Sequence, residues 1–567
     1  MQRNLKEKYK SIITFLTSVG FLCIVLICSN FFYGKFDLTA DKRYTLTPET
    51  IQLLEDLDDV VQLKIYLTGD ELPAGFVKLK NSLDELLNEF SNHTAETIEF
   101  EFINLQDIAS KTKREKEIAR LAQLGIPYLP LKQQHENSST SFYVTPGVEV
   151  FYKGKTVGVS LLEVDHQNFD SNFKAAIENL EYQLSNAIRK LAREHAQNIG
   201  FLQTHGESDQ LELQDLLKTL SEYYVTGPVV IQDHNGIDLN ALSLIDVLVV
   251  SGPKTAFNEG ELFVIDQFIM NGGKALFLLD GIHAELDSLR YAPYFPAMPY
   301  NSGIEKLLFN YGIRINNDIV EDQQCTQIPI QTGPAGSNGK AELYPWVYFP
   351  LLYSDNNHKI NRNLDPVKVE FASTLDSVQG VNKTYYTLLQ TSDRSRYVAT
   401  PTRIGFEDAV AGINDQKLNQ KSKSIAMLSE GQFTSYFNNR ILPEGFSSKK
   451  KLVQENNSAK IIVVGSGTFA NNIILSNEKA LPLGADRYDP SLFYDNKRFL
   501  LNCINYLSGD EDLIAVRSKR IELRLLDKNK VKNEQFFIKT LNIALPPTLI
   551  LLLAAVFYFV RRKKFAI

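Results

Sequence analysis

Two long uncharged segments, one near each end of the chain, constrain its architecture more than any other feature. Residues 11–33 are 23 residues without a charged side chain, and a helix of that length spans roughly 34 Å, enough to cross a bilayer core. Residues 541–560 form the second uncharged segment, which would be a helix of about 30 Å. The sequence therefore predicts a chain that crosses a membrane twice.

Basic residues flank the outer end of each segment. Residues 1–10 contain Arg3, Lys6, Lys8 and Lys10, and residues 561–567 begin with Arg-Arg-Lys-Lys. Positive charge marks the cytoplasmic side of a membrane helix, so both termini are expected in the cytoplasm, with a long domain outside. A cleaved signal peptide is the alternative for residues 11–33. The apolar stretch is longer than the usual 7–15 residues and no A-x-A-like site follows, which favours an anchor.

The region between the segments is large and acidic. The chain has 567 residues, 44% of them hydrophobic and 22% charged, so it can bury more than one core. Removing the +3 of residues 1–10 and the +4 of residues 561–564 from the total of −7 leaves −14. That charge argues against a nucleic-acid or anionic-lipid surface. Cys325 and Cys503 are the only cysteines there, too few for a disulfide scaffold, and the sequence does not reveal whether they pair.

Residues 34–195 are predicted to form a small α/β domain. Thr47 before Pro48 is a typical helix N-cap with proline at the first helical position. Alternating strand-like and helix-like patterns follow, in the order strand, helix, strand and two further strands, with a long bridging helix at 173–194. This order resembles a thioredoxin-like fold, in which Ile126-Pro127 stands where a cis-proline is common. No C-x-x-C occurs, so a scaffold or binding role is expected instead of redox catalysis.

Residues 196–515 are predicted to form a larger α/β domain. Strands near 199–204, 246–252 and 274–280 alternate with helices at 211–224 and 259–270, which predicts a parallel sheet with helices on both faces. Residues 281–457 interrupt this rhythm and are interpreted as an insertion. The pattern returns at 459–472 and in a helix at 497–507. Residues 516–540 are then a linker to the second membrane helix.

His205-Gly206-Glu207 is the first candidate site. It follows a predicted strand, and ligands of open α/β sheets gather outside the carboxyl ends of strands. A histidine and a glutamate two residues apart could act as acid and base or as two metal ligands. No third partner is identifiable, and the favoured interpretation is a capped loop with Glu207 and Asp209 near the start of the next helix. The sequence therefore predicts no metal site and no catalytic residues.

Gly465-Ser466-Gly467 opens the second candidate loop. The sequence GSGTFA matches the dinucleotide pattern G-x-G-x-x-G/A, but that pattern normally opens a domain, whereas here it follows what looks like the last strand. We expect a tight turn at the carboxyl edge of the sheet and no cofactor. Gly252, in Gly-Pro-Lys-Thr after another strand, is a further candidate interaction position. No G-x-x-x-x-G-K-[ST] or G-x-S-x-G occurs, which argues against ATP hydrolysis and a serine nucleophile.

Five motifs in a fixed order carry a family resemblance. They are Asp41-KRYTLTPET after the first span, Thr204-HGE, Val250-SGPK, Asp266-QFIMNGGKALFLLD, and the final GSGTFANN before the terminal span. Over nearly its whole length the chain resembles the gliding-motility protein GldG family, the auxiliary or "substrate-binding" subunits of a bacterial ABC transporter. Its α/β portion also resembles a domain of intraflagellar-transport proteins that act as structural adaptors.

The resemblance implies partners and no reaction. It implies a non-catalytic periplasmic subunit in the inner membrane of Bacteroidetes, acting with an ABC permease and a cytoplasmic P-loop ATPase in gliding motility and the associated secretion. Anchoring at both ends departs from ordinary solute-binding proteins, so a mechanical coupling role is the hypothesis. The alternatives are a periplasmic amidotransferase-like hydrolase that uses His205 and Glu207, and a free-standing envelope scaffold.

Overall fold

The computed structural model divides the chain into two units. One unit is formed by residues 44–519 and the other by residues 1–43 and 520–567. The structure describes residues 17, 19–20, 45–69, 72–94, 98–135, 138–162, 169–193, 196–233, 236–238, 240–331, 341–354, 357–380, 382–410, 416–443, 452–475, 479–489, 492–517 and 535–565.

Helix α13 carries the second predicted membrane span. It runs over Gln535–Phe565, and its segment Asn542–Lys563 is largely apolar and exposed. Its length and composition are sufficient to cross a membrane. The first predicted span, residues 11–33, lies outside the described residues except for residues 17, 19 and 20.

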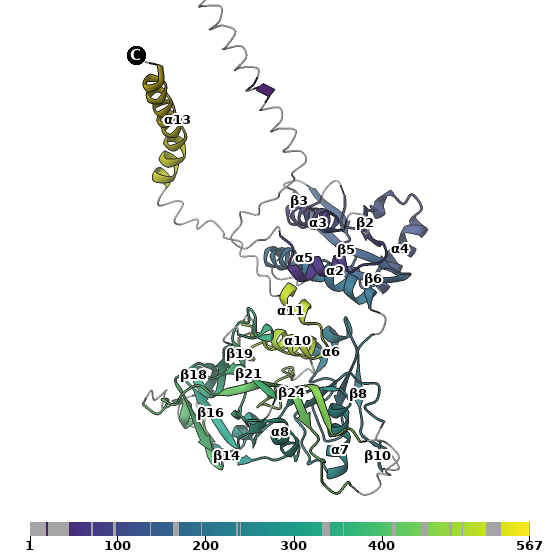
Figure 1. Cartoon of the computed structure of the whole chain (residues 1–567), viewed down its shortest axis with the longest axis vertical. Helices are drawn as coiled ribbons and strands as arrows, with labels where there is room; N and C mark the ends of the chain where they lie inside the picture. Colours follow the sequence, from purple (N-terminus) through teal and green to yellow (C-terminus); the bar gives the residue numbers. More distant parts are fainter. Residues whose placement is uncertain are drawn as a thin grey trace, which may run out of the picture. The chain divides into compact units, whose positions relative to one another are not determined.

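A four-stranded sheet organises the first part of the large unit (Figure 1). Its order is β2-β1-β5-β6; β1 and β2 are parallel, whereas β5 is antiparallel to both β1 and β6. Helix α3 connects the parallel pair, and α5 follows β6. The bounds are α2 Pro48–Glu55, β1 Val61–Ile65, α3 Ala74–His93, β2 Ile98–Phe102, α4 Lys111–Gln123, β3 Leu129–His135, β4 Ser138–Val144, β5 Gly147–Tyr152, β6 Lys155–Ser160 and α5 Phe169–Ala192.

Local signals in this part agree with the sequence. The Thr47 side chain accepts a hydrogen bond from the Thr50 amide at the start of α2, as the N-cap pattern predicted. The Ile126–Pro127 peptide bond is not cis, so the expectation of a cis-proline there is wrong. Among the described residues the cis peptide bond is Thr400–Pro401.

A nine-stranded sheet organises the remainder of the unit. Strands β8, β7, β11, β12 and β25 are parallel neighbours in that order, and β24 continues the sheet antiparallel to β25, followed by β20, β15 and the additional partner β21. The bounds are β7 Asn198–Leu202, β8 Val225–Val229, β11 Val247–Ser251, β12 Lys274–Leu278, β15 Ile313–Ile315, β20 Leu375–Ser377, β21 Lys383–Gln390, β24 Ser424–Thr434 and β25 Glu455–Val464.

Two corrections to the sequence interpretation follow. The sheet is mixed and not purely parallel. In addition, the predicted insertion at about 281–457 is not wholly separate, because β15, β20, β21 and β24 from that stretch belong to the same sheet. Antiparallel strands can follow one another through short turns, so they do not produce the strand–helix rhythm by which the parallel part was recognised. The other strands of this stretch form small two- and three-stranded sheets.

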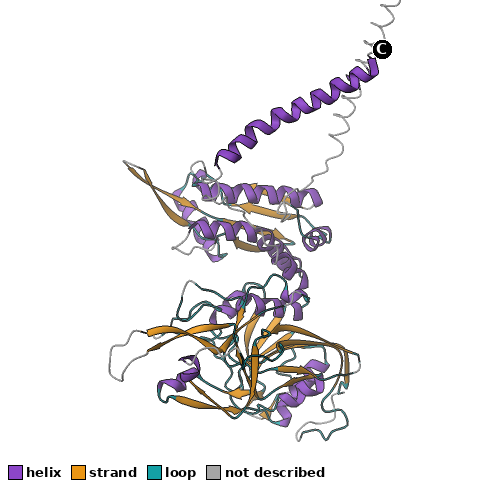
Figure 2. Cartoon of the chain, turned by 90° about the vertical axis from the view of Figure 1, so that its left-hand side faces the viewer, coloured by secondary structure: helices purple, strands orange, loops and turns teal. Residues whose placement is uncertain are grey.

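Helices cover both faces of the large sheet, and alternate strand residues face each layer (Figures 1 and 2). Val249, Leu276 and Ile462 pack with α6 and α10, whereas Val250, Phe277 and Val463 pack with α7 and α8. Burial on both faces explains why these strands read as continuous apolar runs. The helix bounds are α6 Gln214–Ser221, α7 Glu259–Met270, α8 Glu305–Tyr311, α10 Asn496–Leu507 and α11 Glu511–Arg517.

Helices α2, α5 and α11 meet where the two sheet-centred parts join. The Thr47 amide donates to Glu181 of α5 at 2.7 Å, and Tyr182 of α5 packs with Leu513 and Val516 of α11. The carboxylate of Asp510, just before α11, is buried and contacts the Arg193 guanidinium. Helices α2 and α11, the first and last helices that the structure describes in the large unit, are thus joined through α5.

Glu149 provides a test of the smaller sheet. Its carboxylate is fully buried, accepts two hydrogen bonds from Arg120, at 2.5 and 2.8 Å, and one from the Tyr66 hydroxyl at 2.9 Å. Burial raises the pKa of Glu149, but these bonds outweigh burial and hold the pKa below its usual 4.5. The ionised carboxylate therefore stabilises the fold above about pH 4.5, and this contribution is lost as the pH falls toward the lowered pKa.

We predict that Arg120→Met lowers the free energy of unfolding by about 3 kcal/mol at pH 7, because it leaves a buried charge without its cation. The loss should shrink at pH 4, since protonation removes that charge. Urea denaturation at both pH values measures the difference. An equal loss at both would contradict this account of Glu149.

Candidate functional site

The carboxyl edge of the parallel strands gathers the loops predicted from the sequence. In chain order β7, β8, β11, β12 and β25 lie in the spatial order 2-1-3-4-5. The chain therefore passes from β7 to one side and continues on the other side at β11. Such a reversal creates the crevice at which doubly wound sheets bind ligands. His205 follows β7, Gly252 follows β11, and Gly465 follows β25.

His205 is held on all sides. It is 5% exposed, its ring lies 3.8 Å from the Phe257 ring between centroids, and its Nδ1 lies 3.2 Å from the Thr255 hydroxyl. Its Nε2 lies 3.3 Å from Glu261, without hydrogen-bond geometry. Glu261 also closes the capping box with Asn258 at the start of α7. These contacts fix the histidine between the β7 loop and α7.

Glu207 folds back on its own loop. Its Oε2 accepts the His205 amide at 2.7 Å, while its buried Oε1 has no hydrogen-bond partner among the described residues. Gly206 has a φ of +72°, a left-handed conformation that suits glycine and allows this reversal. Asp209, and not Glu207, caps the following turn by accepting the Leu211 and Glu212 amides. The predicted cap is therefore confirmed for Asp209. Glu207 instead accepts a hydrogen bond within its own loop.

The two glycine loops meet each other. The Ser251 hydroxyl donates to the Gly467 carbonyl at 3.3 Å, and a Cβ on Gly252 would lie 3.0 Å from that oxygen. The Gly467 amide donates to Asp280 at 2.6 Å, and a Cβ there would collide with the Asp280 carboxylate. Gly465 is similarly closed by the Ser373 carbonyl. The glycines permit close packing, and the Gly467 amide is already engaged by a carboxylate where a phosphate would need it.

Asp280 is the edge residue that sequence reasoning missed as a site position. Burial raises its pKa to about 6, although the hydrogen bond from Gly467 acts in the opposite direction. Its position at the end of a strand between two other loop-bearing strands was a usable signal. Within the described ranges, no group of three or more His, Cys, Asp or Glu side chains could hold a metal ion, and Cys325 and Cys503 are free thiols.

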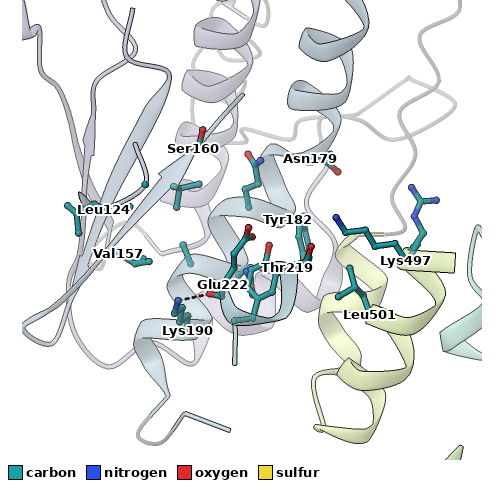
Figure 3. Close-up of a pocket in the computed structure, with 18 of the residues that line it drawn as sticks. Leu124, Val157, Ser160, Asn179, Tyr182, Lys190, Thr219, Glu222, Lys497 and Leu501 are labelled. Atoms are coloured by element: carbon teal, nitrogen blue, oxygen red, sulfur yellow. Dashed lines mark hydrogen bonds between the residues drawn. The ribbon is translucent and has the colours of Figure 1, made fainter. Parts of the chain in front are cut away.

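A cavity of about 280 Å³ adjoins this edge beside Ser466 and Thr468, with Lys368, Glu370 and Arg487 in its wall. A larger one, of about 750 Å³, lies away from the edge between β6, α5, α6 and the start of α10 (Figure 3). Its walls come from segments up to 377 residues apart, from Leu124 to Leu501, and no local motif could have indicated it.

Comparison with known proteins assigns a family to the part of the chain that holds the nine-stranded sheet. Residues 196–503 match the family described as the ABC-type uncharacterized transport system, and residues 40–151 match a domain of unknown function. A protein of Borreliella burgdorferi, described as uncharacterized, is 20% identical over 584 residues, covering 99% of this chain and 100% of that protein.

Two solved structures are similar over part of the chain. The mmIFT52 N-terminal domain is 17% identical with a TM-score of 0.31, covering 55% of this chain and 97% of its own. A putative ThuA-like protein from Parabacteroides merdae is 11% identical with a TM-score of 0.25, covering 56% of this chain and 91% of its own. The family assignment depends on the sequence match, which spans more than half of the chain. On that match, the chain belongs to the ABC-type uncharacterized transport system family and is a transporter-associated accessory protein.

Proposed function

We propose that this chain is a non-catalytic, membrane-anchored periplasmic subunit that couples an ABC permease and its cytoplasmic ATPase to the periplasm. Family membership supports the transporter, and the apolar helix α13 with its basic end supports an anchor whose C-terminus is cytoplasmic. The predicted first span would place the N-terminus on the same side.

The observation that carries the proposal is the packing of α2 against α11. Among the described residues, helix α2 is the first of the large unit after the predicted first span, and α11 is the last before α13. Both pack on α5. In this proposal, a relative displacement of the two membrane segments reaches the unit at this junction, where it can alter how the two sheet-centred parts are held.

Ion pairs give the junction its specificity. Two consecutive acidic residues at the start of α11 face opposite partners: Asp512 pairs with Arg189 of α5 at 2.7 Å, and Glu511 pairs with Lys359 at 2.7 Å and Lys460 at 3.3 Å. Lys359 and Lys460 belong to the larger sheet-centred part. Helix α11 therefore contacts both parts at once, which suits an element that transmits displacement.

We further propose that the complex serves gliding motility and the associated secretion. The order of motifs supports a role in gliding motility and associated secretion, in a bacterium whose inner membrane holds the complex. Deletion of the gene should then abolish spreading on agar and lower secretion together. If the deletion strain kept both spreading and secretion, the role in motility would be contradicted, whereas the accessory role in a transporter would stand.

The transporter partnership predicts that the full-length protein, extracted from membranes in mild detergent, is recovered with a P-loop ATPase and a multi-span permease in a fixed ratio. Affinity purification with quantitative mass spectrometry measures that ratio. Recovery of this protein alone, in detergent that preserves other membrane complexes, would favour the free-standing scaffold.

Coupling through the junction predicts a separate effect. Arg189→Glu should keep the complex assembled but lower its ATPase activity by roughly five- to tenfold in vesicles, because it opposes Asp510 and Asp512. Adding Asp512→Arg restores an opposite pair and should recover part of the activity. Unchanged activity in Arg189→Glu, with the protein folded, would contradict transmission through α11.

The hydrolase alternative is tested at Glu207. If Glu207 were catalytic, its replacement would remove activity without loss of stability. We predict instead that Glu207→Ala lowers the free energy of unfolding by about 1–3 kcal/mol, because the buried His205 amide loses its acceptor. Chemical denaturation measures this. Glu259→Ala, which removes an exposed pair with Lys306, is the matched control and should change stability by less than about 0.5 kcal/mol.

A further inference from the structure

The 750 Å³ cavity has a sheet edge as one wall (Figure 3). Val157 to Ser160 of β6 line one side, helix α5 lines the floor, and the ends of α6 and α10 line the other side. Its volume lies within the range of roughly 300–1,000 Å³ typical of ligand sites, which often form where two parts of a protein join.

Strand β6 presents to this cavity backbone N–H and C=O groups that no described strand pairs with. It is the last strand in the order β2-β1-β5-β6. The Leu161 amide donates to the Pro146 carbonyl at 2.9 Å, and Val159 is paired with Val148. Because the direction alternates along a strand, Leu161, Val159 and Val157 point their N–H and C=O groups to β5. Gly158 and Ser160 therefore point theirs the other way, where no described strand pairs with them.

The facing walls are polar, and among the charged residues that line them the cations outnumber the anions by one. Asn179, Gln183, Asn186 and Lys190 recur every three or four residues, so they share one face of α5. The Gln183 Oε1 atom is buried and has no hydrogen-bond partner among the described residues.

Lys190, Lys497 and Arg498 outnumber Glu222 and Asp495 among the charged lining residues. Lys497 and Arg498 are each about one third exposed in their pairs with Asp215 and Asp495, which leaves donors available.

We propose that this cavity binds an extended, acidic segment of a partner polypeptide, which adds to β6 as a fifth strand. Its backbone pairs with Gly158 and Ser160, and its acidic side chain faces Lys497 and Arg498. Main-chain pairing at a free sheet edge supplies affinity, and side-chain pockets supply selectivity. The inference does not depend on the transporter assignment, because it derives from the sheet edge and the cavity alone.

The test uses the full-length protein in its native membranes with a photoreactive p-benzoylphenylalanine at Tyr223, an aromatic residue in the cavity wall. The same group at Tyr291, which is 91% exposed and outside the cavity, is the control. Mass spectrometry should map the Tyr223 adduct to one acidic segment of a different polypeptide, absent from the Tyr291 control. An adduct with a second copy of this chain, a small molecule or no adduct would overturn the proposal.

Proline variants show whether the bound segment pairs with the strand edge. Ser160→Pro removes an outward N–H inside the cavity, whereas Thr156→Pro removes one on the same edge outside it. Ser160→Pro should lower adduct yield about tenfold and Thr156→Pro should not, with thermal melting confirming that both fold. Gly158 is unsuitable, because a Cβ there would collide with the Leu124 carbonyl.

Arg498→Gln tests the charge without altering the strand, and should lower the yield severalfold. Equal yields in the wild type, Ser160→Pro and Arg498→Gln would overturn strand addition even if a polypeptide were captured.

Discussion

The arrangement of the large unit depends on the contacts of one buried carboxylate, that of Asp510. It is 0% exposed, contacts Arg193 directly after α5, and lies 2.8 Å from the Tyr224 hydroxyl, which is also 2.8 Å from Asn505. A buried charge is costly unless it is paired and hydrogen-bonded, so these partners must be present together. Arg193 directly follows α5, and Tyr224 lies between α6 and β8, so the carboxylate links these two segments. Tyr224 in turn connects them to Asn505 of α10.

Two consequences follow from this joint. Helix α11 begins immediately after Asp510 and is therefore positioned by it, which allows Asp512 and Glu511 to reach opposite parts of the unit. The joint also brings together α5 and α10, which both line the 750 Å³ cavity. The proposed coupling route and the proposed peptide site thus share these helices, although they involve different surfaces.

The candidate residues at the sheet edge could be found from sequence because of a general property of parallel strands. All carboxyl ends lie on the same side, so His205, Gly252 and Gly465 could be assigned to one edge once their strands were recognised. Their partners could not be found in this way. Glu261 beside His205 comes from α7, and Asp280 beside Gly467 comes from a neighbouring strand, and neither lies at a fixed spacing from its partner. Side-chain packing across the loops decides that the glycines are closed and that His205 is enclosed.

The sequence by itself determined the properties that depend on local composition. They are the apolar helix, predicted at 541–560 and found within Asn542–Lys563, the capped start of α2, and the parallel strands whose double-sided burial demands continuous apolar runs. Tertiary structure alone decided that β15, β20, β21 and β24 extend the large sheet, that α2 meets α11, and that β6 borders a cavity. The physical reason is range. Periodicity and capping arise within a few residues, whereas strand addition, buried charge pairing and cavities form between segments that only folding brings together.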